Sequence, residues 1–259
     1  ISDVDMAISG LNKSDLILLA ARPGMGKTSF ALNMLLHAGK FSGKTVVFFS
    51  LEMSREQLAM RLISGESFVD NKKLVTGKLG EEDWTKIAAA SAALNQTQIL
   101  IDDNPSLSVA DMNAKCRRVD NLGLVVIDYL QLMTSAGGPT RSGDNRQQIV
   151  SDISRALKIM AKELNVPVVC LSQLSRGPES RSDKRPMLSD LRESGAIEQD
   201  ADIVMFLYRD DYYNDSDENH NLAECIIAKN RHGETRTVEL QWLPEYTTFS
   251  SIDRRHSEY

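Results

Sequence analysis

The sequence has 259 residues, enough for one large domain or two small ones. Hydrophobic residues make up 42% and charged residues 25%, close to the average for soluble globular proteins. Thirty basic and thirty-six acidic residues give a net charge of −6. That balance argues against a protein that coats nucleic acid through a general basic surface, but it leaves room for local basic patches.

The cysteines, histidines and apolar runs exclude further classes. Cys116, Cys170 and Cys225 are widely spaced in apolar stretches, and we interpret them as reduced, buried thiols of an intracellular protein. The four histidines form no spaced pair with one another or with a cysteine, so no zinc site is predicted. No apolar run is long enough to cross a bilayer. The first residue is Ile1, so we expect the chain to be a fragment of a longer protein.

Short apolar runs alternate along the chain with longer amphipathic stretches. The runs predict strands at 16–21, 45–51, 98–101, 124–128, 166–171 and 203–208. Their nearly continuous Val, Ile and Leu content is typical of a parallel sheet buried on both faces. The stretches between them predict helices at 27–37, 55–64, 83–94, 110–119 and 147–164, the second opened by a capping box of Ser54 and Gln57. This order predicts an α/β fold with a mostly parallel β-sheet flanked by helices.

The pattern changes after residue 208. Residues 223–228 and 235–242 flank a turn at His232 and Gly233, and they predict a C-terminal β-hairpin. Residues 134–145 and 172–189 are rich in Gly, Pro and Ser and are predicted to be surface loops. The segment 141–186 carries nine basic against five acidic residues. That local excess fits either ordinary solvated loops or a basic patch.

The strongest motif stands between the first predicted strand and the first predicted helix. It reads ARPGMGKT, from Ala21 to Thr28, and matches the phosphate-loop pattern G-x-x-x-x-G-K-[ST] except for its first glycine. Glycines allow backbone N–H groups to surround phosphate oxygens, and the following helix directs its positive end at them. The lysine then contacts the outer phosphates and the threonine hydroxyl binds Mg²⁺. We predict that nucleotide binds to Ala21, Arg22, Pro23, Gly24, Met25, Gly26, Lys27, Thr28 and Ser29.

Three further predicted strands end in polar residues. Ligands of open α/β sheets bind at the carboxyl ends of the strands, so these residues are expected near the phosphate loop. Asp128 suits a carboxylate that holds Mg²⁺, and Glu52 suits a general base that activates water. Gln173 suits an amide that senses the γ-phosphate. Either acid could instead cap the helix that follows it. Together with the phosphate loop they predict an enzyme that hydrolyses a nucleoside triphosphate with Mg²⁺.

Several phrases resemble the bacterial replicative helicases of the DnaB type. They are ARPGMGKT at 21–28, SLEMS at 50–54, VVIDYLQL at 125–132, LSQLSR at 171–176, LSDLRESGAIEQDAD at 188–202 and IIAKNR at 226–231. The likeness runs from residue 9 to the last predicted hairpin, and Ala21 in place of glycine is itself the family's form of the loop. It implies that residues 1–259 are a single domain with a RecA-like P-loop NTPase core, without the family's N-terminal helical domain and most of its linker.

The resemblance also implies roles for individual residues. Lys27 and Thr28 would bind the triphosphate and Mg²⁺, Asp128 would be the second acidic metal partner, and Glu52 would be the catalytic base. Gln173 would couple the state of the γ-phosphate to the DNA-facing loops. Lys229 and Arg231 resemble the pair that reaches into the neighbouring subunit's site, although a merely solvated basic edge strand would look the same in sequence. An arginine supplied in trans can raise the rate of such enzymes by about 10³–10⁵-fold.

The DNA-contacting segment of the family matches Arg192, Glu193, Ser194 and Gly195, which could also hold a simple surface ion pair between the first two. Loops without stacking aromatics would grip the backbone of single-stranded DNA, with little sequence preference and strong salt dependence. The family further implies a homo-oligomer, a hexameric ring, with primase and a helicase loader as partners, 5′–3′ polarity and a cytoplasmic, nucleoid-associated location away from membranes.

Two alternatives remain open from the residues. The same engine could serve a RecA-like recombinase or a regulatory ring ATPase without unwinding activity. Nucleotide could also merely order an assembly that has no enzymatic activity. The family's DNA-contacting segment and the Lys229–Arg231 pair argue against the first alternative. Glu52 argues against the second, because a binding module needs no general base.

Overall fold

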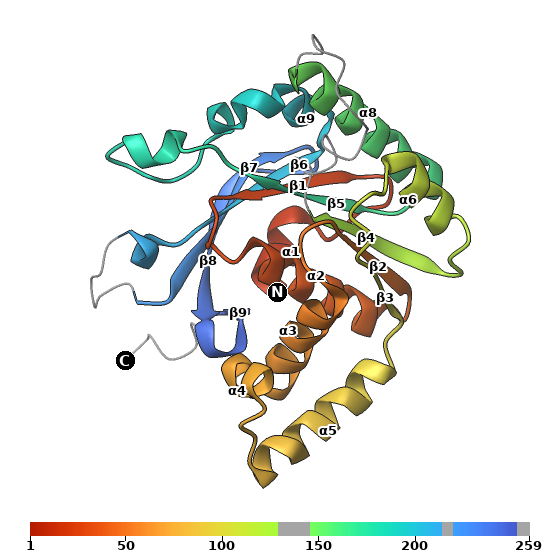
Figure 1. The fold of residues 1–259 in the computed structure, drawn as a ribbon. Coiled ribbons are helices and arrows are strands. Elements are labelled where there is room, and N and C mark those ends of the chain that lie inside the picture. Colours follow the sequence, from red (N-terminus) through yellow and green to blue (C-terminus); the bar gives the residue numbers. More distant parts are fainter. Residues whose placement is uncertain (129–145, 214–219, 253–259) are drawn as a thin grey trace.

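One nine-stranded sheet organises the chain in the computed structural model, which describes residues 1–128, 146–213 and 220–252, and of residues 146–147 and 192–195 the backbone alone (Figure 1). The strands are β1 (Leu16–Ala21), β2 (Thr45–Ser50), β3 (Ile99–Asp102), β4 (Leu122–Asp128), β5 (Val168–Gln173), β6 (Ile203–Tyr208), β7 (Leu222–Asn230), β8 (Arg236–Leu243) and β9 (Thr248–Ser251). Their order across the sheet is β3-β2-β4-β5-β1-β6-β7-β8-β9. No helix in these described ranges is long and apolar enough to cross a membrane.

The parallel part of the sheet runs from β3 to β6, as the sequence predicts. β1 is the central strand of the whole sheet, paired in parallel with β5 on one side and β6 on the other. Every residue of β1 and β6 is buried, because helices cover both faces. The predicted α/β architecture is confirmed.

Helices on the two faces of the sheet close two separate cores. The helices are α1 (Ser2–Ile8), α2 (Lys27–Ser42), α3 (Arg55–Ser67), α4 (Asn71–Thr76), α5 (Glu81–Asn95), α6 (Val109–Cys116), α8 (Arg146–Leu164) and α9 (Gly195–Asp200). Residues of α1, α2 and α3 pack with Ile17 and Leu19 of β1, whereas residues of α6, α8 and α9 pack with Leu16 and Leu18. Successive strand residues point to opposite faces, so one strand supplies both cores.

Local sequence explains where several helices begin. Ser54 accepts a hydrogen bond from the backbone N–H of Gln57, whose side chain accepts one from the Ser54 N–H, so the predicted capping box of α3 is confirmed. Ser108 and Asp111 form a second box at the start of α6. α2 differs, since it begins at Gly26 without a side-chain cap and leaves its first N–H groups available.

The structure also corrects several predicted bounds. The C-terminal hairpin is a three-stranded antiparallel extension, because β9 adds to β8 and β7 joins β6. The predicted loop at 172–189 includes the end of β5 and two short 3₁₀ helices, η1 (Gly177–Ser180) and η2 (Leu188–Ser194). α2 continues five residues beyond the predicted 27–37, to Ser42. The predicted loop at 134–145 lies outside the described residues.

Candidate active site

The phosphate loop connects β1 to α2 through two glycines with left-handed backbone. Gly24 has φ 80° and Gly26 has φ 92°, conformations that side chains disfavour. Met25 between them is 1% exposed and belongs to the core, so only its backbone can face a ligand. The N–H groups at the start of α2 then face the space above the loop, as the phosphate-loop motif requires.

Aromatic side chains from the far end of the chain pack against this loop. A Cβ atom built on Gly26 would lie 2.8 Å from Cζ of Phe249 and 3.4 Å from Cζ3 of Trp242. On Gly24 it would lie 2.9 Å from Cε2 of Tyr212. Gly26 is therefore required by packing against the buried Phe249 as well as by its backbone conformation, whereas at Gly24 the backbone conformation is the main requirement because Tyr212 is exposed.

A cavity of about 320 Å³ opens over the loop, at the carboxyl ends of the parallel strands. It brings together most of the predicted site and adds four unpredicted residues, Met53, Arg61, Trp242 and Thr247. The predicted residues that line it are Ala21, Arg22, Pro23, Gly24, Gly26, Lys27, Thr28, Ser29, Glu52 and Gln173. Such a volume is in the range of small-ligand pockets.

Asp128 lies beneath the start of α2. Its side chain is fully buried, Oδ2 accepts a 2.7 Å hydrogen bond from the Thr28 hydroxyl, and Oδ1 lies 3.6 Å from Nζ of Lys27. Oδ1 is buried without a hydrogen-bond partner among the described residues. A carboxylate oxygen and a hydroxyl beside a phosphate loop are the hard ligands that Mg²⁺ uses in nucleotide sites. The residues present therefore fit Mg²⁺, and the described chain shows no separate cluster of three or more His, Cys, Asp or Glu side chains.

Glu52 is held over the cavity by the turn after β2. The Ser50 hydroxyl donates to the Met53 carbonyl at 2.6 Å and accepts from the Met53 N–H at 3.0 Å. The Leu51 N–H donates to the Asp128 carbonyl at 2.7 Å. This turn fixes the backbone on both sides of Glu52 and leaves its side chain exposed, which suits a base that must reach a bound water.

The end of β5 places Gln173 beside the first residue of the phosphate loop. Gln173 pairs in register with Ala21, and the Leu174 N–H donates to the Ala21 carbonyl at 3.0 Å. Arg22 reaches across the same junction, where its guanidinium donates to the Leu174 carbonyl at 2.8 Å and to Glu179 Oε1 at 2.6 Å. The phosphate loop and the segment after β5 are thus tied together.

Arg61 is the most informative residue that the sequence analysis missed. It lines the cavity from α3, where burial lowers the pKa of its guanidinium while the charges of Asp128 and Glu52 act in the opposite direction. The sequence does contain an indication of this role. Arg61 lies next to the apolar stripe that Leu58 and Leu62 form on the buried face of α3. A charged residue beside such a stripe indicates a partner inside the fold.

Lys229 and Arg231 lie near the amino-terminal ends of the parallel strands, and the phosphate loop lies at their carboxyl ends. Ile203 pairs with Asn230 at one end of β6, and Ile17 pairs with Ile203, whereas the loop follows the other end of β1. With about 3.3 Å per residue along a strand, the two ends are roughly 15–20 Å apart. The structure therefore does not bring these two residues to their own chain's cavity. The backbone of the predicted DNA segment, Arg192–Gly195, spans the junction of η2 and α9.

Fold and site together define a P-loop NTPase domain with a RecA-like core. The chain belongs to the DnaB-like helicase C terminal domain family, whose model matches residues 1–251. It is 53% identical to the replicative DNA helicase DnaB of Geobacillus stearothermophilus and 51% identical to the replicative DNA helicase DnaC of Bacillus subtilis. Each comparison covers 99% of this chain but 57% of the relative, so the chain spans little more than half the length of these relatives.

Solved structures agree with this assignment. An ATPase domain with 41% identity superposes with a TM-score of 0.90, covering 97% of this chain and 89% of that domain. A DnaB-like replicative helicase, described with its interactions with primase, gives a TM-score of 0.91 at 41% identity, covering 98% of this chain and 61% of that one. The RadB recombinase gives 0.60 at 17% identity, which shows the common fold alone.

Proposed function

We propose that this chain is the ATP-hydrolysing motor domain of a replicative DNA helicase, acting in a ring of identical subunits along single-stranded DNA. One observation carries the proposal. The phosphate loop, Glu52 and Asp128 gather at one edge of the sheet, while Lys229 and Arg231 lie at the other. A site divided in this way is completed by a neighbouring copy, so hydrolysis depends on assembly.

The chemistry assigned to each residue follows from its position. Lys27 binds the outer phosphates of ATP, and Thr28 and Asp128 would hold Mg²⁺, which would supply positive charge against the charge that develops on the phosphates. Glu52 accepts the proton of the attacking water, and Gln173 contacts the γ-phosphate from the end of β5. Arg231 of the next subunit stabilises the transition state, with Lys229 beside it. Bound Mg²⁺ would supply a partner to Oδ1 of Asp128, and a phosphate oxygen would accept a hydrogen bond from the buried Thr247 hydroxyl, which has no partner within the described residues.

We infer that DNA contacts centre on Arg192, Glu193, Ser194 and Gly195. Their backbone lies where η2 passes into α9, and an arginine at this junction would contact phosphate oxygens without reading bases. Binding through phosphates predicts little base preference and an affinity that falls steeply with salt. By analogy with the relatives, we propose that the subunits form a hexameric ring. Primase and a helicase loader would be its partners, and it would act in the cytoplasm at the nucleoid.

The experiment that tests the proposal is the ATPase rate measured against protein concentration, with and without unstructured single-stranded DNA. A rate per subunit that rises with concentration, and rises again with DNA, is expected for shared sites coupled to DNA. A rate per subunit that is constant and indifferent to DNA would refute the shared site and the coupling.

The matched control is Lys27→Ala, which removes the phosphate-binding charge without touching the predicted trans residues. We expect the affinity for a fluorescent ATP analogue to fall by at least tenfold, since a hydrogen bond to a charged group contributes about 1.5–3 kcal/mol. An unchanged affinity would contradict the assignment of the cavity to nucleotide.

A further inference from the structure

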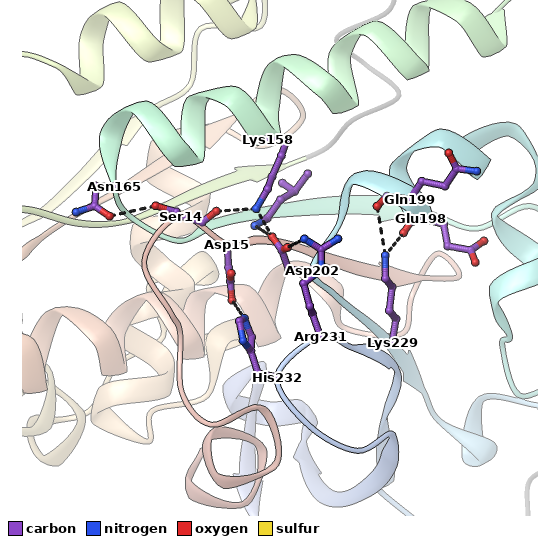
Figure 2. Close-up of polar contacts among 11 residues, drawn as sticks. Ser14, Asp15, Lys158, Asn165, Glu198, Gln199, Asp202, Lys229, Arg231 and His232 are labelled. Atoms are coloured by element: carbon purple, nitrogen blue, oxygen red, sulfur yellow. Dashed lines mark hydrogen bonds and ion pairs between the residues drawn. The ribbon is translucent and has the colours of Figure 1, made fainter.

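A buried carboxylate lies at the edge of the sheet that carries Lys229 and Arg231. Asp202 stands between α9 and β6, and its side chain is 2% exposed (Figure 2). Its backbone is also fixed, since its N–H donates to the Leu16 carbonyl at 2.8 Å and its carbonyl accepts from the Arg231 N–H at 2.9 Å. Asp202 does not line the nucleotide cavity, so it has no direct contact with a nucleotide bound to its own chain.

The two oxygens of this carboxylate are divided between different partners. Oδ2 accepts a 2.9 Å hydrogen bond from the Leu16 N–H and lies 2.5 Å from Nζ of Lys158, which reaches it from α8. Oδ1 lies 2.8 Å from Nη1 of Arg231. Burial acts to raise the pKa of Asp202, but these donors outweigh it and the pKa is lowered. The carboxylate is therefore ionised, and its charge is shared by a fixed lysine and by Arg231.

One nitrogen of the Arg231 guanidinium is bound inside the fold, while much of the side chain is exposed to solvent. The Arg231 side chain is 55% exposed although its Nη1 holds a buried carboxylate. A guanidinium is a rigid plane with five N–H donors, so fixing one nitrogen directs the remaining donors outward. Lys229 is held at the same edge, where its ammonium donates to the carbonyls of Glu198 and Gln199 at the end of α9 (Figure 2). Arg231 is thus held at one guanidinium nitrogen, and the Lys229 ammonium is held against its own chain.

We propose that Asp202 is the positioning residue for Arg231, holding its guanidinium in the direction from which it enters the nucleotide site of the neighbouring subunit. This inference rests on the proposed function, in which Arg231 acts in trans. The Leu16 N–H and Lys158 occupy Oδ2, so within the described part of the chain Oδ1 is left for Arg231. A mobile arginine would have to find its position at each turnover, and a displacement of about 1 Å can cost roughly 100-fold in rate.

The decisive variant is Asp202→Asn, which keeps the shape of the side chain and removes the charge that holds the guanidinium. We expect kcat to fall by about 10–100-fold, with the affinity for the ATP analogue within twofold of wild type because the variant's own phosphate loop is intact. The matched control is Glu224→Gln. It breaks another arginine pair on the same strand, in which Arg185 Nη2 lies 2.6 Å from Glu224 Oε1. That control is expected to keep a wild-type kcat.

Rings of mixed variants distinguish a misplaced Arg231 from a general loss of folding or of the variant's own nucleotide site. Lys27→Ala subunits have a defective site of their own but an intact Arg231, so in mixed rings they restore hydrolysis at the intact sites of Asp202→Asn subunits. We expect at least a fivefold rise over the sum of the separate rates. Should Asp202→Asn fail to bind the ATP analogue, the double variant Asp202→Asn with Lys158→Met removes both charges together and leaves no unpaired buried cation.

Arg231→Ala mixed with Lys27→Ala supplies the reference. Rescue of Arg231→Ala without rescue of Asp202→Asn would overturn the positioning role and leave the proposed function standing. A wild-type kcat for Asp202→Asn alone would overturn it as well. If neither mixture regains activity, the shared site itself fails, and the positioning role with it.

Discussion

The replacement of Gly26 by alanine tests how the end of the chain supports the phosphate loop. Two costs combine at this position. The left-handed backbone, with φ 92°, disfavours a side chain by about 1–2 kcal/mol. The new Cβ would also lie 2.8 Å from the ring of Phe249, and overpacking of that kind costs about 1–3 kcal/mol.

The sum predicts that Gly26→Ala lowers the free energy of unfolding by about 2–5 kcal/mol, or lowers Tm by roughly 5–20 °C in a chain of this size. Phe249 has little room to yield, because its ring packs edge-on against Phe30 at 5.6 Å and against Trp242 at 4.5 Å between centroids. We also expect nucleotide affinity to fall by at least tenfold, because a displaced Gly26 would move the backbone N–H groups of the phosphate loop that bind the phosphates.

Gly43 at the other end of α2 provides a matched control. It has φ 63° and nothing within 4 Å of the Cβ it would carry, so Gly43→Ala measures the backbone cost without the clash. Urea unfolding of Gly26→Ala, Phe249→Leu and the double variant then isolates the contact. We expect the double variant to be more stable than additivity predicts by about 1–2 kcal/mol. Strict additivity, or equal losses for Gly26→Ala and Gly43→Ala, would refute the packing argument.

Three further outcomes are expected. Glu52→Gln keeps nucleotide affinity and loses at least about 100-fold in hydrolysis, and normal turnover in an ATPase assay would remove Glu52 as the base. Arg61→Ala raises the KM for ATP by about 10–100-fold, because a donor to a charged group contributes about 1.5–3 kcal/mol; an unaltered KM would place Arg61 outside the binding set. Desolvation raises the pKa of Cys116, Cys170 and Cys225 to about 12 from the ordinary 9.0. The folded state therefore keeps protons that the unfolded state releases, so stability falls as pH rises from 9.0 toward 12. Native protein should resist a thiol reagent at pH 8, and rapid labelling would contradict this burial.

The part of the site that could be predicted from sequence is the part built from neighbouring residues. The phosphate loop, its helix, Glu52 in the turn after β2 and Asp128 at the end of β4 each belong to a short segment, so their spacing is visible in the chain. Asp128 could be assigned because the carboxyl ends of parallel strands meet at one edge.

The rest depends on contacts between distant segments. Trp242 of β8 and Thr247, just before β9, reach the cavity from positions more than 200 residues after the loop, and no local pattern reports such a contact. Asp202 is one of several acids in the segment 188–202, and its partners Lys158 and Arg231 belong to other elements. β9 has four residues, too few for a reliable alternation of polar and apolar side chains.

The central place of β1 has a consequence for how the protein is made. β1 ends at Ala21, yet its two neighbours in the sheet are Val168–Gln173 and Ile203–Tyr208, and the loop after it packs against Phe249. During synthesis from the N-terminus, the phosphate-binding motif therefore leaves the ribosome long before any strand that can hold it. The phosphate loop is among the first parts of the domain to be synthesised, and the residues that pack against it are among the last. Nucleotide cannot assist folding of a nascent chain until nearly all of this sequence has been translated, and a chain that stops before β9 carries the motif without its support.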